Sequence, residues 1–186
     1  ILKHNTFPLA MPSANVSSGI SPINAENVAD EFKSNIKMII DGGKSKIGIE
    51  STVVDLTSKP KILRPGIISH NFINKVLSLK MKPVNKSIKI KSPGMFKRHY
   101  SPRIPMFLNH NSVVTKHAFI TFGNKFLNKK NYFNLSKKAN LNEAASNLYE
   151  ILRKIKKLKY KRIYVSKIPN KGAGIAINDR LKRAAY

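Results

Sequence analysis

The chain of 186 residues contains no cysteine. This absence excludes a disulfide framework, a thiolate metal site and a cysteine nucleophile. The sequence also lacks an apolar run of the roughly 20 residues that a membrane-spanning helix needs, and its first residues do not have the basic-then-apolar layout of a signal peptide. We therefore expect a soluble, cytoplasmic protein with no membrane attachment. A hydrophobic content of 41% is enough for a packed core.

Acidic residues are scarce: the chain has 9 of them against 35 lysines and arginines, a net charge of +26. Most of the excess lies after residue 78, and arginine, which pairs bidentately with phosphate, is the minority cation. Asparagine and isoleucine are abundant as well, as in proteins from AT-rich genomes. This composition favours a compositional origin of the charge. A selected surface for weak binding of RNA, double-stranded RNA included, is the alternative.

Residues 1–78 predict short strands and two helices. We expect a strand over 8–15 ending in a polar turn, a helix from an N-cap at Ser21 to about Ile36, and a strand over 38–40. The β-branched run inside 47–56 and residues 61–64 predict two more strands. Ser69 should cap a second helix. The expected inward-facing residues of the two helices are Ala25, Val28, Ala29, Phe32, Phe72, Ile73, Val76 and Leu77.

The composition divides the rest of the chain in two. Residues 79–105 hold four prolines, many lysines and no acid, which is typical of an extended linker. Residues 106–186 predict strands over 117–122 and 162–166, and helices over 142–158 and from the Gly172-Ala173-Gly174 turn onward. This order predicts a small α/β layer.

Neither of two glycine motifs nor any single histidine is enough to predict a nucleotide-binding or metal-binding site. Gly43-Lys44-Ser45 lacks the glycine that a phosphate-binding loop needs at position 38, and the 172–174 pair lacks the glycine at 177 of a dinucleotide fingerprint. No two histidines stand four residues apart, so we expect no metal site. The loop that contains His99-Tyr100 is either a flap that closes over an anion and an aromatic ring or a solvated basic linker.

Several short motifs occur in one order along the chain: Pro-Ser-Ala-Asn at 12–15, Ser-Pro at 21–22, Glu-Ser-Thr-Val-Val-Asp at 50–55, Leu-Arg-Pro-Gly at 63–66 and Ser-Pro-Gly-Met-x-x-x-His-Tyr at 92–100. In this order the chain resembles the threonylcarbamoyl-AMP synthase family in its two-domain form. The resemblance implies an α/β fold: the C-terminal part of a YrdC-like twisted α/β domain (1–78), a linker and active-site flap (79–105), and a small Rossmann-like α/β/α domain (106–186).

The resemblance also implies an activity and its site residues. Family members are nucleotidyltransferases that make threonylcarbamoyl-adenylate from L-threonine, bicarbonate or CO2, and ATP carrying Mg2+, and the product feeds the tRNA-modification machinery. The residues that match ATP-binding positions are Ser13, Ser21, Arg64, His99 and Tyr100. Ser51 and the backbone of Met11 match threonine-binding positions of the family. Asn15 and Thr52 match motif positions that are possible ligand contacts.

One part of the family pattern has no counterpart in these residues: a Lys-x-Arg motif that handles ATP and the carbamate, and with it the expected catalytic residues. We expect it upstream of Ile1, so the chain reads as a fragment or the product of a split gene that is inactive alone. Two other classes stay open. One is a basic RNA-binding or tRNA-binding protein on a degenerate catalytic scaffold, whose binding would weaken steeply with salt. The other is a regulatory module that uses 106–186 to bind a ligand.

Overall fold

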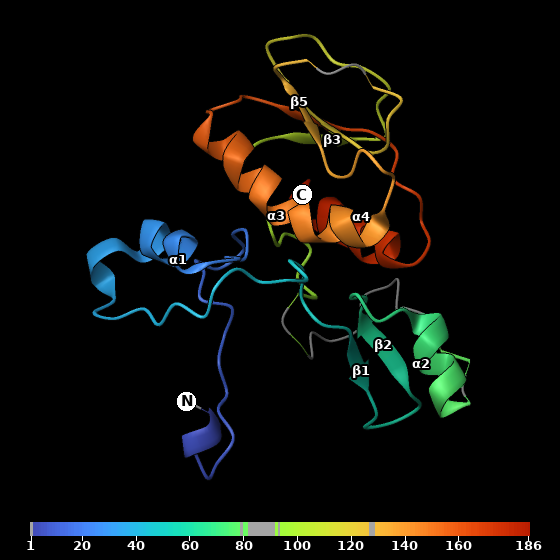
Figure 1. Ribbon diagram of the computed structural model, residues 1–186. Helices are drawn as coiled ribbons and strands as arrows, with labels where there is room; N and C mark the ends of the chain where they lie inside the picture. The colour runs from blue at the N-terminus through green and yellow to red at the C-terminus, as the bar shows by residue number, and fades with distance from the viewer. Residues whose placement is uncertain (1, 79, 82–91, 93, 127–128) are drawn as a thin grey trace.

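The computed structural model describes residues 2–78, 80–81, 92, 94–126 and 129–186. The described chain forms two units, one built on a two-stranded sheet and one on a four-stranded sheet, which lie against each other (Figure 1). Residues 79, 82–91 and 93 of the linker predicted over 79–105, Pro93 of the expected flap included, fall outside the described residues.

The first unit holds a β-hairpin, two α-helices and two short 3-10 helices, η1 (Leu2–His4) and η2 (Lys33–Asn35). Strands β1 (Val53–Asp55) and β2 (Lys61–Arg64) pair antiparallel with a register shift between Val53 and Val54. Helix α2 (His70–Leu77) follows, and Ser69 Oγ caps it by accepting from the Phe72 N–H, as its sequence predicts. The predicted strand over 61–64 is confirmed as well.

Four predictions in the first unit are wrong. The two helices contain no buried residue, so the expected inward-facing side chains do not form a core there, and Phe72 and Val76 are 61% and 64% exposed. Residues 8–15 and 38–40 form no strand, because they lie exposed with no partner strand in the described chain, and Pro8 and Pro12 have no N–H to donate.

Helix α1 (Ala25–Phe32) is capped by Asn24, not by Ser21, although its continuation as η2 to Asn35 agrees with the predicted end near Ile36. The Ser21 hydroxyl donates a hydrogen bond to Glu50 instead of capping backbone N–H groups of a helix. The N-cap is therefore Asn24, three residues later.

The second unit is a parallel sheet in the order β3-β6-β4-β5. Its strands are β3 (Met106–Leu108), β4 (Ala118–Thr121), β5 (Tyr132–Asn134) and β6 (Ile163–Val165), and its helices are α3 (Leu141–Lys157) and α4 (Ala173–Ala184). The predicted elements around 118–121, 141–157, 163–165 and 173–184 are confirmed. Strands β3 and β5 were missed because, unlike β4 and β6, they contain no β-branched residue.

The core of the molecule lies between this sheet and its helices. Ile120, Ile163 and Val165 face Leu148 and Ile155 of α3 and the buried side chains of α4, all nearly free of solvent. The α/β class is therefore confirmed. The two helices pack against each other and against the sheet (Figure 1).

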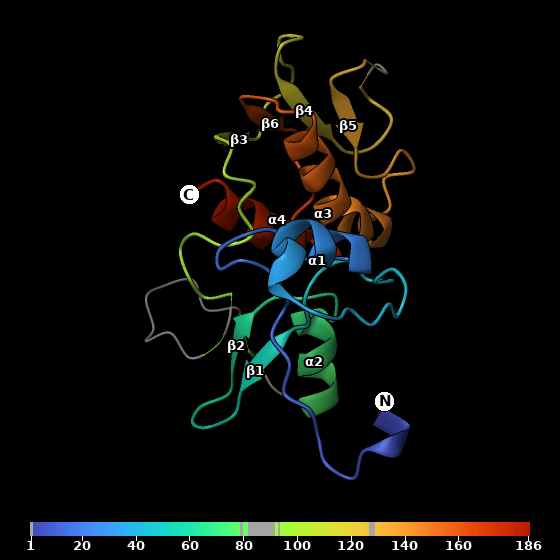
Figure 2. The same ribbon diagram turned by 90° about the vertical axis from the view of Figure 1, so that its left-hand side faces the viewer.

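The two units are joined along α3. Gly48, at φ +76°, lies against the backbone of Ser146, where a Cβ would have no room. Arg153 of α3 donates to the Ile20 carbonyl and pairs with Glu31 of α1 at 3.0 Å, which places α1 beside α3 (Figure 2). Packing in the second unit thus holds the exposed loops of the first unit in place.

Candidate active site

Glu50, just before β1, is the centre of a buried polar cluster. The Ser21 hydroxyl donates to its Oε1 at 2.6 Å, and the Tyr149 hydroxyl of α3 donates to Oε2 at 2.8 Å. Arg180 of α4 donates from Nε to Oε2 at 3.0 Å. Because these three donors come from three distant parts of the sequence, the cluster exists only when both units are packed together. Sequence reasoning found Ser21 and missed Tyr149 and Arg180.

Glu50 is held in its charged form. Burial acts to raise its pKa, but Arg180 and the hydrogen bonds from Ser21 and Tyr149 together bring the pKa below the ordinary glutamate value. Burial and the charge of Glu50 raise the pKa of Tyr149 well above its usual range, so this phenol stays protonated and donates. The pair therefore serves as a fixed negative anchor and does not exchange protons near neutral pH.

Arg64, at the end of β2, lies next to Ser51. Its Nε donates to the Ser51 carbonyl at 3.1 Å, and its Nη2 donates to Ser51 Oγ at 3.4 Å. The arginine is only 8% exposed, so its planar guanidinium is held in one orientation. A fixed guanidinium beside a hydroxyl can bind an anionic oxygen such as that of a phosphate or a carboxylate. The structure thus brings together two of the residues that the sequence singled out.

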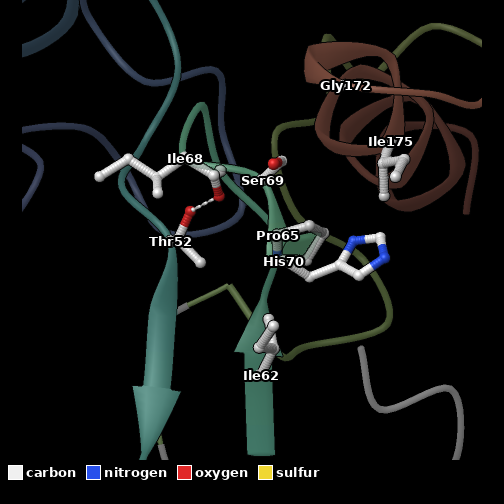
Figure 3. A pocket seen from close by; sticks show the side chains of 9 residues that line it. Thr52, Ile62, Pro65, Ile68, Ser69, His70, Gly172 and Ile175 are labelled. Atoms are coloured by element: carbon white, nitrogen blue, oxygen red, sulfur yellow. Dashed lines mark hydrogen bonds between the residues drawn. The ribbon is translucent and has the colours of Figure 1, made fainter. Parts of the chain in front are cut away.

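The Leu-Arg-Pro-Gly and Glu-Ser-Thr motifs touch through their backbones. A Cβ on Gly66 would overlap the Thr52 amide nitrogen and lie 2.8 Å from the Glu50 carbonyl oxygen, so only glycine permits this approach. The Thr52 hydroxyl donates to the Ile68 carbonyl at 2.7 Å (Figure 3). This hydrogen bond fixes the loop that follows β2 against the start of the Glu-Ser-Thr-Val-Val-Asp segment.

The crevice beside Thr52 is very small. Its volume is about 10 Å³, and its lining residues include Pro65, His70 and Ile175 of α4 (Figure 3). This is about the space of one water molecule, so the crevice is not a nucleotide site.

Tyr100 is at the point where the flap meets both units. The side chain is 1% exposed, its ring lies 5.8 Å from the Tyr149 ring, and the Arg180 guanidinium sits 5.1 Å from its centroid. A Cβ on Gly94 would overlap the Tyr100 hydroxyl and lie 2.8 Å from Arg64 Cδ, so Gly94 packs closely against both Tyr100 and Arg64. The aromatic ring of the predicted flap is therefore part of the packed interior.

His99 lies on the outer side of Tyr100, with the ring centroids 4.0 Å apart. Its backbone N–H donates to the Arg183 carbonyl, and Arg183 donates in turn to the Phe96 carbonyl at 2.8 Å. Burial lowers the pKa of His99, and the nearby arginines lower it further against the opposing effect of Glu50. The imidazole is therefore mostly neutral at pH 7 and can accept a hydrogen bond.

Ser13, Asn15 and Met11 lie apart from this cluster. Ser13 Oγ donates to Asn15 Oδ1 at 2.5 Å, and Asn15 donates to the carbonyls of Val16 and Gly19. Met11 is 75% exposed. The loop that follows them does reach the flap, because the Ser101 N–H donates to the Ser18 carbonyl at 2.9 Å. These three candidates thus stand on an exposed turn whose far end is tied to the cluster.

Two features are absent from the described residues. They contain no group of three histidine, aspartate or glutamate side chains placed to hold a metal ion. No helix in the described part of the chain is both long and apolar enough to cross a membrane.

The fold and the site define a two-unit α/β protein in which an arginine, a serine and an aromatic flap meet at a buried ion pair between the units. Comparison with known families is consistent with this arrangement. The family model described as threonylcarbamoyl-AMP synthase, C-terminal domain, matches residues 68–186, and a model described as telomere recombination matches residues 1–66. The chain belongs to the threonylcarbamoyl-AMP synthase family.

Individual relatives agree with the family assignment. A threonylcarbamoyl-AMP synthase of Pyrococcus abyssi is 34% identical over 198 residues, which cover 96% of this chain and 58% of that protein. One from Bacillus subtilis is 31% identical over 213 residues, covering 100% of this chain and 59% of that protein. The crystal structure of P. abyssi Sua5 complexed with L-threonine aligns with a TM-score of 0.80 and 32% identity, over 94% of this chain and 56% of that one. The chain thus spans less than two thirds of the length of these relatives.

Proposed function

We propose that the complete protein containing this chain is a threonylcarbamoyl-AMP synthase. It forms threonylcarbamoyl-adenylate from L-threonine, bicarbonate or CO2, and ATP, releases pyrophosphate, and supplies the product to the machinery that modifies tRNA. The observation that carries the proposal is the meeting of Arg64, Ser51 and the His99-Tyr100 flap in a chain of this family.

In this proposal Arg64 binds the phosphates of ATP. Its guanidinium is buried and oriented, and a fixed planar cation stabilises charge that develops on a phosphate without having to reorganise. Ser13 and Ser21 supply hydroxyl oxygens to the nucleotide. The Ser21 hydroxyl already donates its proton to Glu50, so it meets ATP as an acceptor of a hydrogen bond.

Threonine binds next to the same arginine. Ser51 Oγ accepts from Arg64 and keeps its own proton free to donate to the amino acid, and the exposed backbone of Met11 offers a further contact. A solved structure of the P. abyssi relative is a complex with L-threonine, which supports this part of the proposal. Asn15 and Thr52 act indirectly, since their side chains are bonded to neighbouring backbone groups.

The reaction needs alignment and charge stabilisation more than a strong base. The threonine amine first adds to CO2, which bicarbonate supplies with loss of water, and releases a proton to give a carbamate. A carbamate oxygen then attacks the α-phosphorus, a new O–P bond forms, and the bond to pyrophosphate breaks. His99 and Tyr100 cover the site and keep water from the carbamate. Arg180, Tyr149 and Glu50 are positioning residues that hold Ser51 and Tyr100 where this chemistry needs them.

Mg2+ enters the proposal as a partner of the ATP phosphates. This ion prefers oxygen ligands and is usually held by one or two carboxylates together with substrate phosphates. Glu50, the carboxylate in the cluster, is occupied by Arg180 and two hydroxyls. The described residues therefore fit an ion that arrives on the nucleotide better than an ion held by the protein.

The test is an assay of pyrophosphate release by the complete protein with ATP, L-threonine and bicarbonate. We expect release that requires all three, a product with the mass of threonylcarbamoyl-adenylate, and a raised KM for threonine in Ser51→Ala. Release that is independent of threonine, or no release by a folded protein, would refute the proposal.

The net charge of +26 supports one alternative, binding of RNA by a scaffold that no longer catalyses the reaction. Affinity for tRNA that falls steeply with added salt, in a protein that neither binds nor turns over ATP and threonine, would favour this reading.

A further inference from the structure

A second cavity lies in the C-terminal unit, at the ends of β3 and β6. Its volume is about 200 Å³, and its lining comes from the segments that follow these two strands and from the facing side of α4. Its ten lining residues are Leu108, Asn109, Val165, Ser166, Lys167, Ile168, Asn170, Asn178, Leu181 and Lys182. None of them belongs to the Glu50 cluster or to the motifs of the first unit, so this is a separate feature of the molecule.

The position of the cavity is one where α/β proteins bind ligands. Strands β3 and β6 are parallel neighbours, with Leu108 opposite Val165, so both end at the same edge of the sheet. Ligands of open parallel sheets bind outside the carboxyl ends of the strands, where loops are free of the sheet's hydrogen bonding. The cavity occupies this edge.

Ser166, the first residue after β6, carries an unused polar atom. The side chain is 4% exposed, and its Oγ has no hydrogen-bond partner within the described chain, although its backbone N–H donates to the Ile120 carbonyl at 2.8 Å. A buried hydroxyl without a partner costs free energy, so its presence calls for an explanation such as a bound ligand. Because Ser166 lines the cavity, a ligand there can satisfy it.

The charge of the lining has one sign. Lys167 and Lys182 line the cavity and none of its lining residues is acidic. The nearest carboxylate in the α4 sequence, Asp179, is paired with Arg180 and Arg183 and does not neutralise these lysines. The cavity therefore favours a negative ligand.

Size and apolar content narrow the ligand further. Leu108, Val165, Ile168 and Leu181 supply apolar surface beside the two lysines. Pockets for drug-sized molecules begin at roughly 300 Å³, so a volume of about 200 Å³ favours a ligand smaller than a nucleotide. We propose that this cavity binds a small organic anion, with one carboxylate or phosphate group at Ser166, Lys167 and Lys182 and a short apolar part against the leucine and isoleucine side chains.

The test follows backbone amide resonances of the 15N-labelled complete protein during titration with butyrate and, separately, with inorganic phosphate, against sodium chloride at equal ionic strength. We expect saturable shifts at residues 165–168 and at Asn178, with butyrate binding more tightly because only it has an apolar part. Half-saturation should rise at least tenfold in Lys167→Gln/Lys182→Gln, and about fivefold in Ser166→Ala, which loses one hydrogen bond.

The matched control is Lys157→Gln/Lys161→Gln, which removes the same charge from exposed lysines outside the cavity and should leave half-saturation unchanged. The proposal is overturned by shifts that grow linearly without saturation, by shifts confined to the surroundings of Arg64, or by equal weakening in both double variants. The readout is local to the cavity, so it stands or falls independently of the synthase activity.

Discussion

Glu50 and Arg180 form an ion pair across the boundary between the two units, with Nε 3.0 Å from Oε2 and no exposure of the arginine side chain. The same guanidinium donates to the Pro65 carbonyl at 2.7 Å and lies over the Tyr100 ring. One side chain of α4 thereby touches the Glu-Ser-Thr motif, the Leu-Arg-Pro-Gly motif and the flap. This is a structural reason for the second unit to accompany the first.

Replacing Arg180 should destabilise the protein strongly. Arg180→Met leaves the buried Glu50 charge without its partner, and breaking a buried pair from one side costs about 3–5 kcal/mol. Denaturant unfolding of wild type and variant measures the loss. Arg162→Met, at an exposed arginine of the same unit, is the control and should change the free energy of unfolding by less than about 0.5 kcal/mol. Equal effects of the two variants would contradict a stabilising role for the pair.

Gly66→Ala should push the Leu-Arg-Pro-Gly motif away from the Glu-Ser-Thr motif and destabilise the protein. The new Cβ would overlap the Thr52 amide nitrogen, a backbone atom that cannot move alone, so we expect a loss of about 2–3 kcal/mol. Gly42→Ala is the control, because a Cβ there meets nothing within 4 Å. Thermal unfolding of both variants checks this. A Gly66→Ala protein as stable as Gly42→Ala would show that the close approach does not exist.

Stability should fall as the pH drops below about 6.5, the ordinary histidine pKa. The pKa of His99 is lowered in the folded protein, so the unfolded chain takes up the proton first and is favoured as the pH falls through this range. Glu50, whose pKa is also lowered, adds a loss only below about 4.5. Unfolding midpoints measured between pH 8 and 5 should therefore decline in wild type.

The contribution of His99 to this decline is separable. His99→Gln should flatten the profile between pH 6.5 and 5, whereas His4→Gln, at an exposed histidine, should keep the wild-type slope. An unchanged slope in His99→Gln would assign the pH dependence to other groups.

Arg64→Lys should impair use of ATP in the complete protein. An ammonium cannot reproduce the two-pronged contact of the guanidinium with Ser51 and with phosphate oxygens. Loss of such a contact is typically worth tenfold or more in kcat/KM for ATP, with a smaller effect on the KM for threonine. Steady-state kinetics with each substrate varied provide the measurement. ATP kinetics equal to wild type would leave Arg64 as a structural residue only.

Bound ATP and threonine should slow proteolysis after Lys97 and Arg98, which are exposed and lie next to the buried Tyr100. Cleavage after Lys137 and Lys138, exposed residues of the other unit, should continue at the same rate and is the internal control. A flap that is cleaved equally fast with and without saturating ligands is not part of the nucleotide site.

Variants that test the flap should keep the buried ring of Tyr100 in place. Alanine at this position would remove a ring from the core and cost about 3–5 kcal/mol, so a double alanine variant tests folding as much as catalysis. Tyr100→Phe keeps the ring and removes the hydroxyl, and His99→Gln replaces the titratable imidazole with an uncharged amide of similar size. We expect lowered activity with an unchanged unfolding midpoint at pH 8, where His99 is neutral in both the folded and the unfolded chain.

Local chemistry in the sequence was sufficient to predict the elements that depend on their own residues. Helix α3 carries an apolar stripe over four turns, α2 has its serine cap, and β2 is stopped by Pro65-Gly66. The motif order was sufficient to identify the family. The same motifs predicted Arg64, Ser51 and Tyr100 as site residues, and the structure places these three residues close together.

Only the tertiary structure decided which polar groups share the cluster and which apolar segments pair. Tyr149 and Arg180 lie about 100 residues or more from Glu50, and no spacing rule links them. Residues 8–15 and 38–40 have strand-like composition, but a strand needs a neighbour to receive its hydrogen bonds, and the described chain provides none. A helix cap or a turn is determined within a few residues, whereas strand pairing and buried ion pairs depend on contacts that only the folded chain makes.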